Sequence, residues 1–254
     1  MNLLEKLGIV GLRTPGRAAA LPSAVRPLGQ VSGSVAAVGY SGGNAPQGGK
    51  GQESSRVSNG LKEFLWNLEG VGRGRLLELG PAWQTTLNFF IERGFRVSSE
   101  DLLRAWKESQ LAEEKKLQTV VGGAVDGIDI SADGRAVRFL ATNLQFPASS
   151  FDAILLWDLL DYFEPRLARS VVAALTDLLR PGGVIFAMFH SRKPESFQRY
   201  RVVDSMTLQS LPATEIYPAQ RVYQNREIQD LFRQYRTTKS FVGRDQLREV
   251  LFVK

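Results

Sequence analysis

The sequence predicts an α/β domain built on a mainly parallel sheet, and three observations support this fold class. Residues 75–79 form a short apolar strand that runs into a glycine turn and then into a helix at 84–93. Strand-like and helix-like segments then alternate along the chain, as a parallel sheet with helical crossovers requires. Two further strands, 238–242 and 248–253, close the chain around a tight turn. We therefore expect helices on both faces of one sheet.

The composition narrows the possible functions. The chain has 254 residues, of which 43% are hydrophobic, an ordinary share for a globular protein. It has no cysteine and a single histidine, His190, so disulfides and thiolate metal sites are excluded and no metal site is expected. No apolar run approaches the roughly 20 residues of a membrane span, and we expect a cytoplasmic protein.

The net charge of +6 does not indicate a nucleic-acid-binding surface. Residues 1–60 hold six basic and two acidic side chains and thus carry +4 of this charge, which leaves only +2 for the rest of the chain. A strong basic face on the folded part is therefore not predicted.

Residues 1–55 are predicted to be a disordered tail, with a short helix at 1–12. Glycine, serine, alanine and proline dominate residues 13–55, and such a segment buries too little apolar surface to offset the entropy lost on ordering. The folded domain is expected to cover residues 56–254.

Helices are predicted where apolar residues recur every three or four positions, and strands where short apolar runs are bounded by turn residues. The predicted helices lie at 56–69, with Ser58 or Asn59 as cap, and at 84–93, 101–120, 165–180 and 226–235. The predicted strands lie at 75–79, 95–99, 137–140, 153–157, 184–189, 238–242 and 248–253. Residues 141–151 are predicted to be a loop, and residues 195–211 are ambiguous.

Carboxylates stand where three of these strands end. Glu78 lies near the end of the first strand, Glu100 and Asp101 follow the second, and Asp158 follows the fourth. Glu100 and Asp101 lie roughly 20 residues beyond the glycine turn, where nucleotide-binding α/β domains place a carboxylate for ribose hydroxyls. Asp101 is equally well placed to cap the helix that follows it.

These features together resemble the class I S-adenosylmethionine-dependent methyltransferases over residues 56–254. The resemblance rests on five motifs: Glu78-Leu79-Gly80, Glu100-Asp101, Phe151-Asp152, Leu179-Arg180-Pro181-Gly182-Gly183, and the closing hairpin with Arg248-Glu249-Val250. It implies a seven-stranded Rossmann-like sheet of order 3-2-1-4-5-7-6 whose last strand is antiparallel. It also implies S-adenosylmethionine as cofactor and methyl transfer to an acceptor, most simply a small molecule.

The resemblance also implies a set of site residues. Those expected to bind the cofactor are Glu78, Gly80, Pro81, Ala82, Glu100, Asp101, Leu140, Asn143 and Asp158. Leu140 stands where the family often has an aspartate beside the adenine amino group, and either the backbone groups of Leu140 and Ala141 or the Asn143 side chain would take its place. Asn143 is as well suited to a turn or cap.

Two residues are predicted to take part in catalysis, Asp158 and Tyr162. Methyl transfer from a sulfonium depends mainly on positioning, but a hydroxyl or amine acceptor also needs a base. Asp158 either serves as that base or caps the turn that follows, and Tyr162 either lines the acceptor pocket or packs locally. His190 ends the fifth strand and is predicted to be a hydrogen-bonding loop residue rather than the base.

One departure from the family keeps two alternatives open. Ala82 and Gln84 occupy positions where the family commonly has glycine, with Trp83 between them. A non-catalytic relative that binds a cofactor or a partner is therefore the alternative function. A nicotinamide-dependent dehydrogenase is disfavoured, because the Gly-x-Gly-x-x-Gly spacing is absent.

The acceptor and the oligomeric state are not predicted by the sequence. Four basic residues after the fifth strand suit an anionic acceptor, but they suit a solvated loop at least as well. They are Arg192, Lys193, Arg199 and Arg201.

Overall fold

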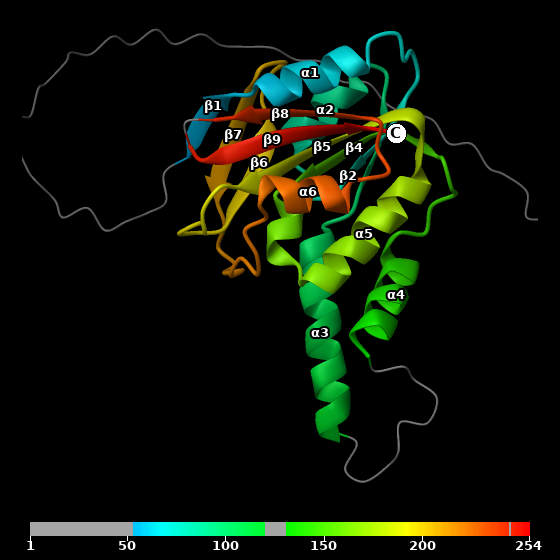
Figure 1. Ribbon diagram of the computed structural model, residues 1–254, viewed down its shortest axis with the longest axis vertical. Coiled ribbons are helices and arrows are strands. Elements are labelled where there is room, and N and C mark those ends of the chain that lie inside the picture. Colours follow the sequence, from blue (N-terminus) through cyan, green and yellow to red (C-terminus); the bar gives the residue numbers. More distant parts are fainter. Residues whose placement is uncertain (1–52, 120–130, 244) are drawn as a thin grey trace, which may run out of the picture. The chain divides into compact units, whose positions relative to one another are not determined.

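The structure is a computed structural model that describes residues 53–119, 131–243 and 245–254 (Figure 1). The predicted tail and the helix at 1–12 thus lie outside the described residues, except that strand β1 (Ser54–Val57) already includes the last residues assigned to the tail. Within the described ranges, no helix combines the length and apolar character needed to cross a bilayer. The cytoplasmic location stays a prediction.

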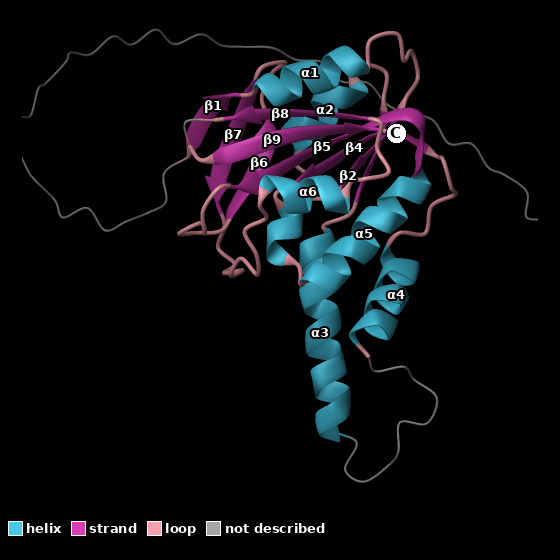
Figure 2. Ribbon diagram, viewed as in Figure 1, coloured by secondary structure: helices cyan, strands magenta, loops and turns pink. Residues whose placement is uncertain are grey.

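The central sheet has six strands in the order β3-β2-β4-β5-β9-β8 (Figure 2). Their bounds are Arg75–Glu78 for β2, Arg96–Ser99 for β3, Phe151–Trp157 for β4, Leu179–His190 for β5, Thr237–Val242 for β8 and Leu247–Val253 for β9. Strands β3, β2, β4 and β5 are parallel, and β9 is antiparallel to both of its neighbours. The predicted order is confirmed for these six strands, including the antiparallel last strand.

The predicted third strand is wrong, so the described sheet has six strands and not seven. Residues 137–140 lie in helix α4 (Ala132–Asn143), which also takes in the start of the predicted loop. The Ser131 hydroxyl caps this helix by accepting the Gly134 N–H at 3.0 Å. Ala136 and Phe139 are buried on one face while Val137 is exposed, which is the spacing of an amphipathic helix.

Helices cover both faces of the sheet, as predicted. Helices α1 (Asn59–Asn67) and α2 (Gln84–Ile91) pack on one face. Helices α3 (Leu102–Thr119), α4, α5 (Pro165–Leu178) and α6 (Asn225–Leu231) pack on the other. Successive strand residues point to opposite faces, so Ala153 and Leu155 of β4 join one core while Ile154 and Leu156 join the other. Helix α1 begins at the predicted cap, since the Ser58 hydroxyl accepts the Leu61 N–H.

A second, three-stranded antiparallel sheet of order β1-β7-β6 was not predicted. It joins β1 to β6 (Gln198–Val202) and β7 (Thr207–Pro212), which lie in the stretch that the sequence left ambiguous. The Val202 N–H of β6 donates to the Thr86 hydroxyl of α2 at 3.0 Å, and Tyr200 and Val202 are buried with the α1–α2 core. These contacts tie the small sheet to the main domain.

Candidate functional site

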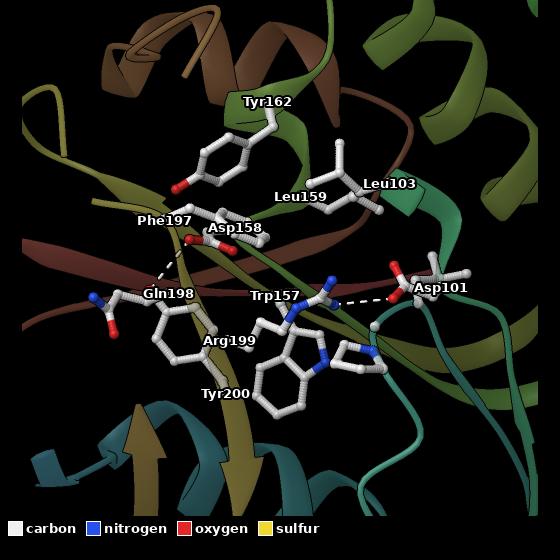
Figure 3. A pocket seen from close by; sticks show the side chains of 13 residues that line it. Asp101, Leu103, Trp157, Asp158, Leu159, Tyr162, Phe197, Gln198, Arg199 and Tyr200 are labelled. Carbon is white, nitrogen blue, oxygen red and sulfur yellow. Dashed lines mark hydrogen bonds and ion pairs between the residues drawn. The ribbon is translucent and has the colours of Figure 1, made fainter. Parts of the chain in front are cut away.

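The carboxyl ends of β2 and β4 and the segment after β3 meet at one cavity, as a parallel sheet requires (Figure 3). Five of the predicted site residues line it: Gly80, Pro81, Asp101, Asp158 and Tyr162. Strand β6 and the residue before it supply the opposite wall, through Phe197, Gln198, Arg199 and Tyr200. The sequence did not predict that wall.

Glu78 is fully buried and does not belong to the lining of the cavity. Burial raises the pKa of its carboxyl from 4.5 to about 8, against the opposing effect of the neighbouring Trp157 indole N–H. Among the described residues, neither carboxylate oxygen has a partner that meets hydrogen-bond geometry. A buried polar group without a partner is costly, so Glu78 is a group to which a ligand donor would be matched.

The other predicted cofactor residues also lie outside the lining of the cavity. Glu100 is half-buried and donates its backbone N–H to the Glu78 carbonyl at 2.8 Å, while Ala82 is exposed outside the cavity lining. Leu140 and Asn143 lie on α4, and the structure does not bring them to the cavity. The Asn143 side chain donates to the Phe139 carbonyl one turn earlier, because residues 137–143 are helical.

Asp101 is held by Arg199, which reaches across the cavity from β6 (Figure 3). The two side chains form an ion pair at 2.9 Å, and Arg199 also approaches Glu215 at 3.4 Å. The Asp101 carboxylate accepts the Arg104 N–H at 3.3 Å as well, so the helix-capping alternative is realised too. The predicted ribose carboxylate is thus engaged by the chain itself.

Trp157 fills the space above the glycine turn. A methyl group on Gly80 would come within 2.9 Å of the indole Cδ1, so glycine is required here by the indole packed against it. Trp157 also has a φ of 53°, a left-handed conformation that is strained for a bulky residue. Its ring stacks on Tyr200 of β6, with ring centroids 6.0 Å apart.

These side chains leave little free space in the cavity. Its free volume is about 30 Å³, which is room for a few water molecules, whereas sites for drug-sized ligands occupy ~300 Å³ or more. The Arg199–Asp101 ion pair and the Tyr200–Trp157 stack narrow it from the side of β6. A nucleotide-sized ligand needs more room than these side chains leave.

Asp158 belongs to a buried network that the sequence did not foresee. One of its carboxylate oxygens, Oδ2, accepts the Tyr200 hydroxyl at 3.2 Å and lies 3.8 Å from His190 Nε2. Burial raises the pKa of Asp158 from 3.8 to about 7. Asp158 makes no side-chain cap to the 3₁₀ helix η2 (Leu159–Tyr162) that follows it, so the capping alternative is not realised.

His190 is buried in this network rather than placed in a loop. Asp161 Oδ2 accepts both its backbone N–H at 2.7 Å and its Nδ1–H at 3.0 Å. Burial lowers the pKa of His190, but the Asp161 hydrogen bond and the negative charges of Asp158 and Asp161 outweigh it, so the pKa lies above its ordinary value. In the sequence, this site could have been recognised from the two aspartates that stand three residues apart, Asp158 and Asp161.

Tyr162 and Arg248 complete the surroundings of His190. The Tyr162 ring packs edge-on against Phe197 and His190, as its packing alternative required, and its buried hydroxyl has no hydrogen-bond partner among the described residues. Arg248 of β9 donates to the carbonyls of His190 and Tyr223 and to the Asn225 side chain. The guanidinium therefore holds the end of β5 in place.

Comparison with known proteins gives similarity at the level of structure. No family model matches the chain, and no curated protein matches it. Among solved structures, the PH0226 protein from Pyrococcus horikoshii is 17% identical with a TM-score of 0.40, over 75% of this chain and 86% of that one. A S-adenosylmethionine-dependent methyltransferase from Methanosarcina mazei is 14% identical with a TM-score of 0.38, over 72% and 93%.

A third similar structure is the 1,6-didemethyltoxoflavin-N1-methyltransferase of Burkholderia thailandensis. It is 16% identical with a TM-score of 0.38, over 77% of this chain and 78% of that one. Likeness this low carries no inference about ligand or activity. The sheet order and the antiparallel β9 decide the fold. The fold is that of class I methyltransferases.

Proposed function

We propose that the protein is a S-adenosylmethionine-dependent methyltransferase that acts on a small-molecule acceptor. The observation that carries the proposal is the buried Glu78 carboxyl, whose two oxygens lack hydrogen-bond partners directly beneath the glycine turn of a methyltransferase sheet. Asp101 and Asp158 lie at the ends of the neighbouring strands around the same cavity. Carboxylates at these three strand ends suit a ligand with an ammonium group and a ribose diol.

The chain's residues fit such a cofactor chemically. Glu78 would accept hydrogen bonds from the ammonium group, and Asp101 would accept them from the ribose hydroxyls. Gly80 and Pro81 would lie against the methionine portion. When bound, the cofactor supplies a methyl group that its sulfonium has already activated, so the protein's main task is to hold the acceptor in line.

The narrow cavity sets one condition for binding. Arg199 must release Asp101, and Tyr200 and Trp157 must separate, before the cavity reaches the volume that a nucleoside requires. A partly exposed ion pair contributes about 1 kcal/mol, so the opening is within reach of the binding energy of a cofactor.

Calorimetric titration of the full chain tests the proposal. Saturable binding of both S-adenosylmethionine and its demethylated product, S-adenosylhomocysteine, is expected. Asp101→Asn and Glu78→Gln should each weaken it, because Asp101→Asn removes a charged acceptor worth about 1.5–3 kcal/mol and Glu78→Gln removes the carboxyl that an adjacent ammonium group would bring to its charged form. Glu92→Gln, on the exposed end of α2, is the matched control and should bind like the wild type.

Failure of a folded protein to bind either ligand would overturn the proposal. The non-catalytic alternative would then hold, and the narrow cavity would be the permanent state of the site. Binding that is unaffected by both carboxylate variants would place the cofactor elsewhere, and would also count against the proposal.

A further inference from the structure

A second cavity lies beside the first and shares part of β6 with it. Its free volume is about 310 Å³, within reach of a small ligand. His190, Arg192 and Lys193 line it from the end of β5, and Arg56 lines it from β1. Gln198 and Tyr200 line both cavities. The two cavities therefore adjoin at these two side chains.

His190 connects the two cavities. It lines the second one, while its Nε2 lies 3.8 Å from Oδ2 of Asp158, which lines the first. The bond from Nδ1–H to Asp161 assigns the neutral tautomer with its proton on Nδ1. This leaves Nε2 as the nitrogen with a free lone pair. A base oriented by a carboxylate on its far nitrogen is the arrangement that proton abstraction requires.

Some of the basic side chains around the second cavity form ion pairs and others do not. Arg56 is paired with Asp245 at 3.0 Å and with Glu249 at 2.5 Å. Arg192 and Lys193 form no ion pair within the part of the chain that the structure describes, and both are exposed. Glu195 and Asp245 are the acidic side chains that line this cavity, and Asp245 is the one paired with Arg56. Among the described residues, two unpaired cations beside one unpaired carboxylate favour an anionic group on the ligand.

We propose that this second cavity is the acceptor site, that the acceptor is a small molecule bearing an anionic group and a hydroxyl or amine, and that His190 takes the proton from that hydroxyl or amine. This inference rests on the proposed methyl transfer. The acceptor oxygen or nitrogen forms its bond to the methyl carbon as the carbon–sulfur bond breaks and its electron pair stays on sulfur. The displaced proton moves to Nε2 of His190, with Asp161 as the positioning residue.

The protonation chemistry agrees with this geometry. The groups that face His190 are Asp158 from the end of β4, Asp161 and Tyr162 from η2, and Asp245 and Arg248 from the closing hairpin, while Tyr200 from β6 bonds Asp158. The negative charges of Asp158 and Asp161 raise the pKa of His190, so they favour the protonated imidazole that forms when Nε2 takes a proton.

Because His190 is the only histidine in the sequence, nuclear magnetic resonance of ¹⁵N-histidine-labelled full-length protein reports on this site alone. The neutral imidazole should carry its proton on Nδ1. Asp161→Asn should lower the measured pKa of His190 by about 1 or more, since it removes an adjacent negative charge but keeps an acceptor for Nδ1–H. A proton on Nε2 in the neutral form, or an unchanged pKa in Asp161→Asn, would overturn the role of His190.

Inorganic phosphate serves as the probe for the anionic group. It should shift the imidazole resonances saturably, and the double variant Arg192→Gln/Lys193→Gln should weaken this binding about ten-fold. The double variant Arg96→Gln/Arg135→Gln removes the same charge from exposed positions on β3 and α4 and should bind phosphate like the wild type. An absent phosphate shift, or equal weakening in both double variants, would overturn the anionic acceptor.

Failure of this inference is distinguishable from failure of the methyltransferase proposal. His190→Gln should leave the affinity for S-adenosylhomocysteine within about two-fold of the wild type, because His190 does not line the first cavity. If the wild type does not bind S-adenosylhomocysteine, the proposed function is overturned. Loss of that binding in His190→Gln alone would instead assign His190 to the cofactor pocket and overturn the acceptor site.

Discussion

Replacing Glu78 with glutamine is expected to remove a strong pH dependence from the stability of the domain. The Glu78 carboxyl is fully buried at the end of β2, and burial raises its pKa from 4.5 to about 8. Below pH 4.5 this carboxyl is protonated in the folded and the unfolded chain alike. As the pH rises toward 8, the unfolded chain releases the proton while the folded chain retains it, so the free energy of unfolding falls across that window.

The size of the effect follows from the pKa difference. Each pKa unit corresponds to about 1.4 kcal/mol, so a rise from 4.5 to about 8 costs the folded state about 3 kcal/mol between pH 5 and pH 8. Glutamine has nearly the shape of the neutral carboxyl and does not titrate. The variant should therefore match the wild type near pH 5 and exceed its stability by about 3 kcal/mol at pH 8.

Urea unfolding followed by tryptophan fluorescence at pH 5, 6.5 and 8 measures this difference. Asp158 also titrates in this range, but it does so in both proteins, so the difference between the two curves isolates Glu78. Glu92→Gln should run parallel to the wild type at every pH. Parallel curves for Glu78→Gln would refute the reasoning, because they would mean that Glu78 is ionised, or hydrated, in the folded protein.

Three further variants test the packing around the two cavities. Gly80→Ala places a methyl group 2.9 Å from Cδ1 of Trp157 and should lower the free energy of unfolding by about 1–3 kcal/mol. In the same urea titration Gly72→Ala should have little effect, because its methyl group meets nothing within 4 Å. Arg248→Met removes the donors to the His190 carbonyl and Asn225 and should cost about 3 kcal/mol and move the His190 imidazole resonances, while the exposed Arg226→Met should do neither. Arg199→Gln releases Asp101 and should tighten S-adenosylhomocysteine binding about five-fold, the equivalent of an ion pair of about 1 kcal/mol. Arg201→Gln on the same strand is the control. Equal affinity in the two variants would mean that the Arg199–Asp101 ion pair does not oppose binding.

Strand β6 connects the two proposed sites in a way that bears on substrate order. Its Arg199 side chain pairs with Asp101 in the first cavity, and its Gln198 and Tyr200 line both cavities. Movement of β6 that admits a cofactor therefore also changes the shape of the proposed acceptor site. The Val202–Thr86 hydrogen bond ties the far end of β6 to helix α2.

The sequence by itself determined the succession of strands and helices, because an apolar strand, a glycine turn and a following helix are recognisable within some 20 residues. The order of the strands in the sheet was implied by the resemblance to class I methyltransferases, whose right-handed parallel crossovers place the ends of these strands at one edge. Asp101 and Asp158 could therefore be assigned to one edge of the sheet. The same local reasoning failed at 137–140, where a four-residue apolar run is compatible with either a strand or one turn of an amphipathic helix.

Only the tertiary structure decided what faces those carboxylates. Strand β6 acquires its place by pairing with β7, which pairs in turn with β1 some 150 residues earlier in the chain, a contact that no local pattern encodes. The raised pKa of Glu78 and the orientation of His190 by Asp161 likewise depend on burial and on partners from other elements. Periodicity in a sequence reports which residues are buried, whereas the chemistry of a buried group depends on the neighbours that folding brings to it.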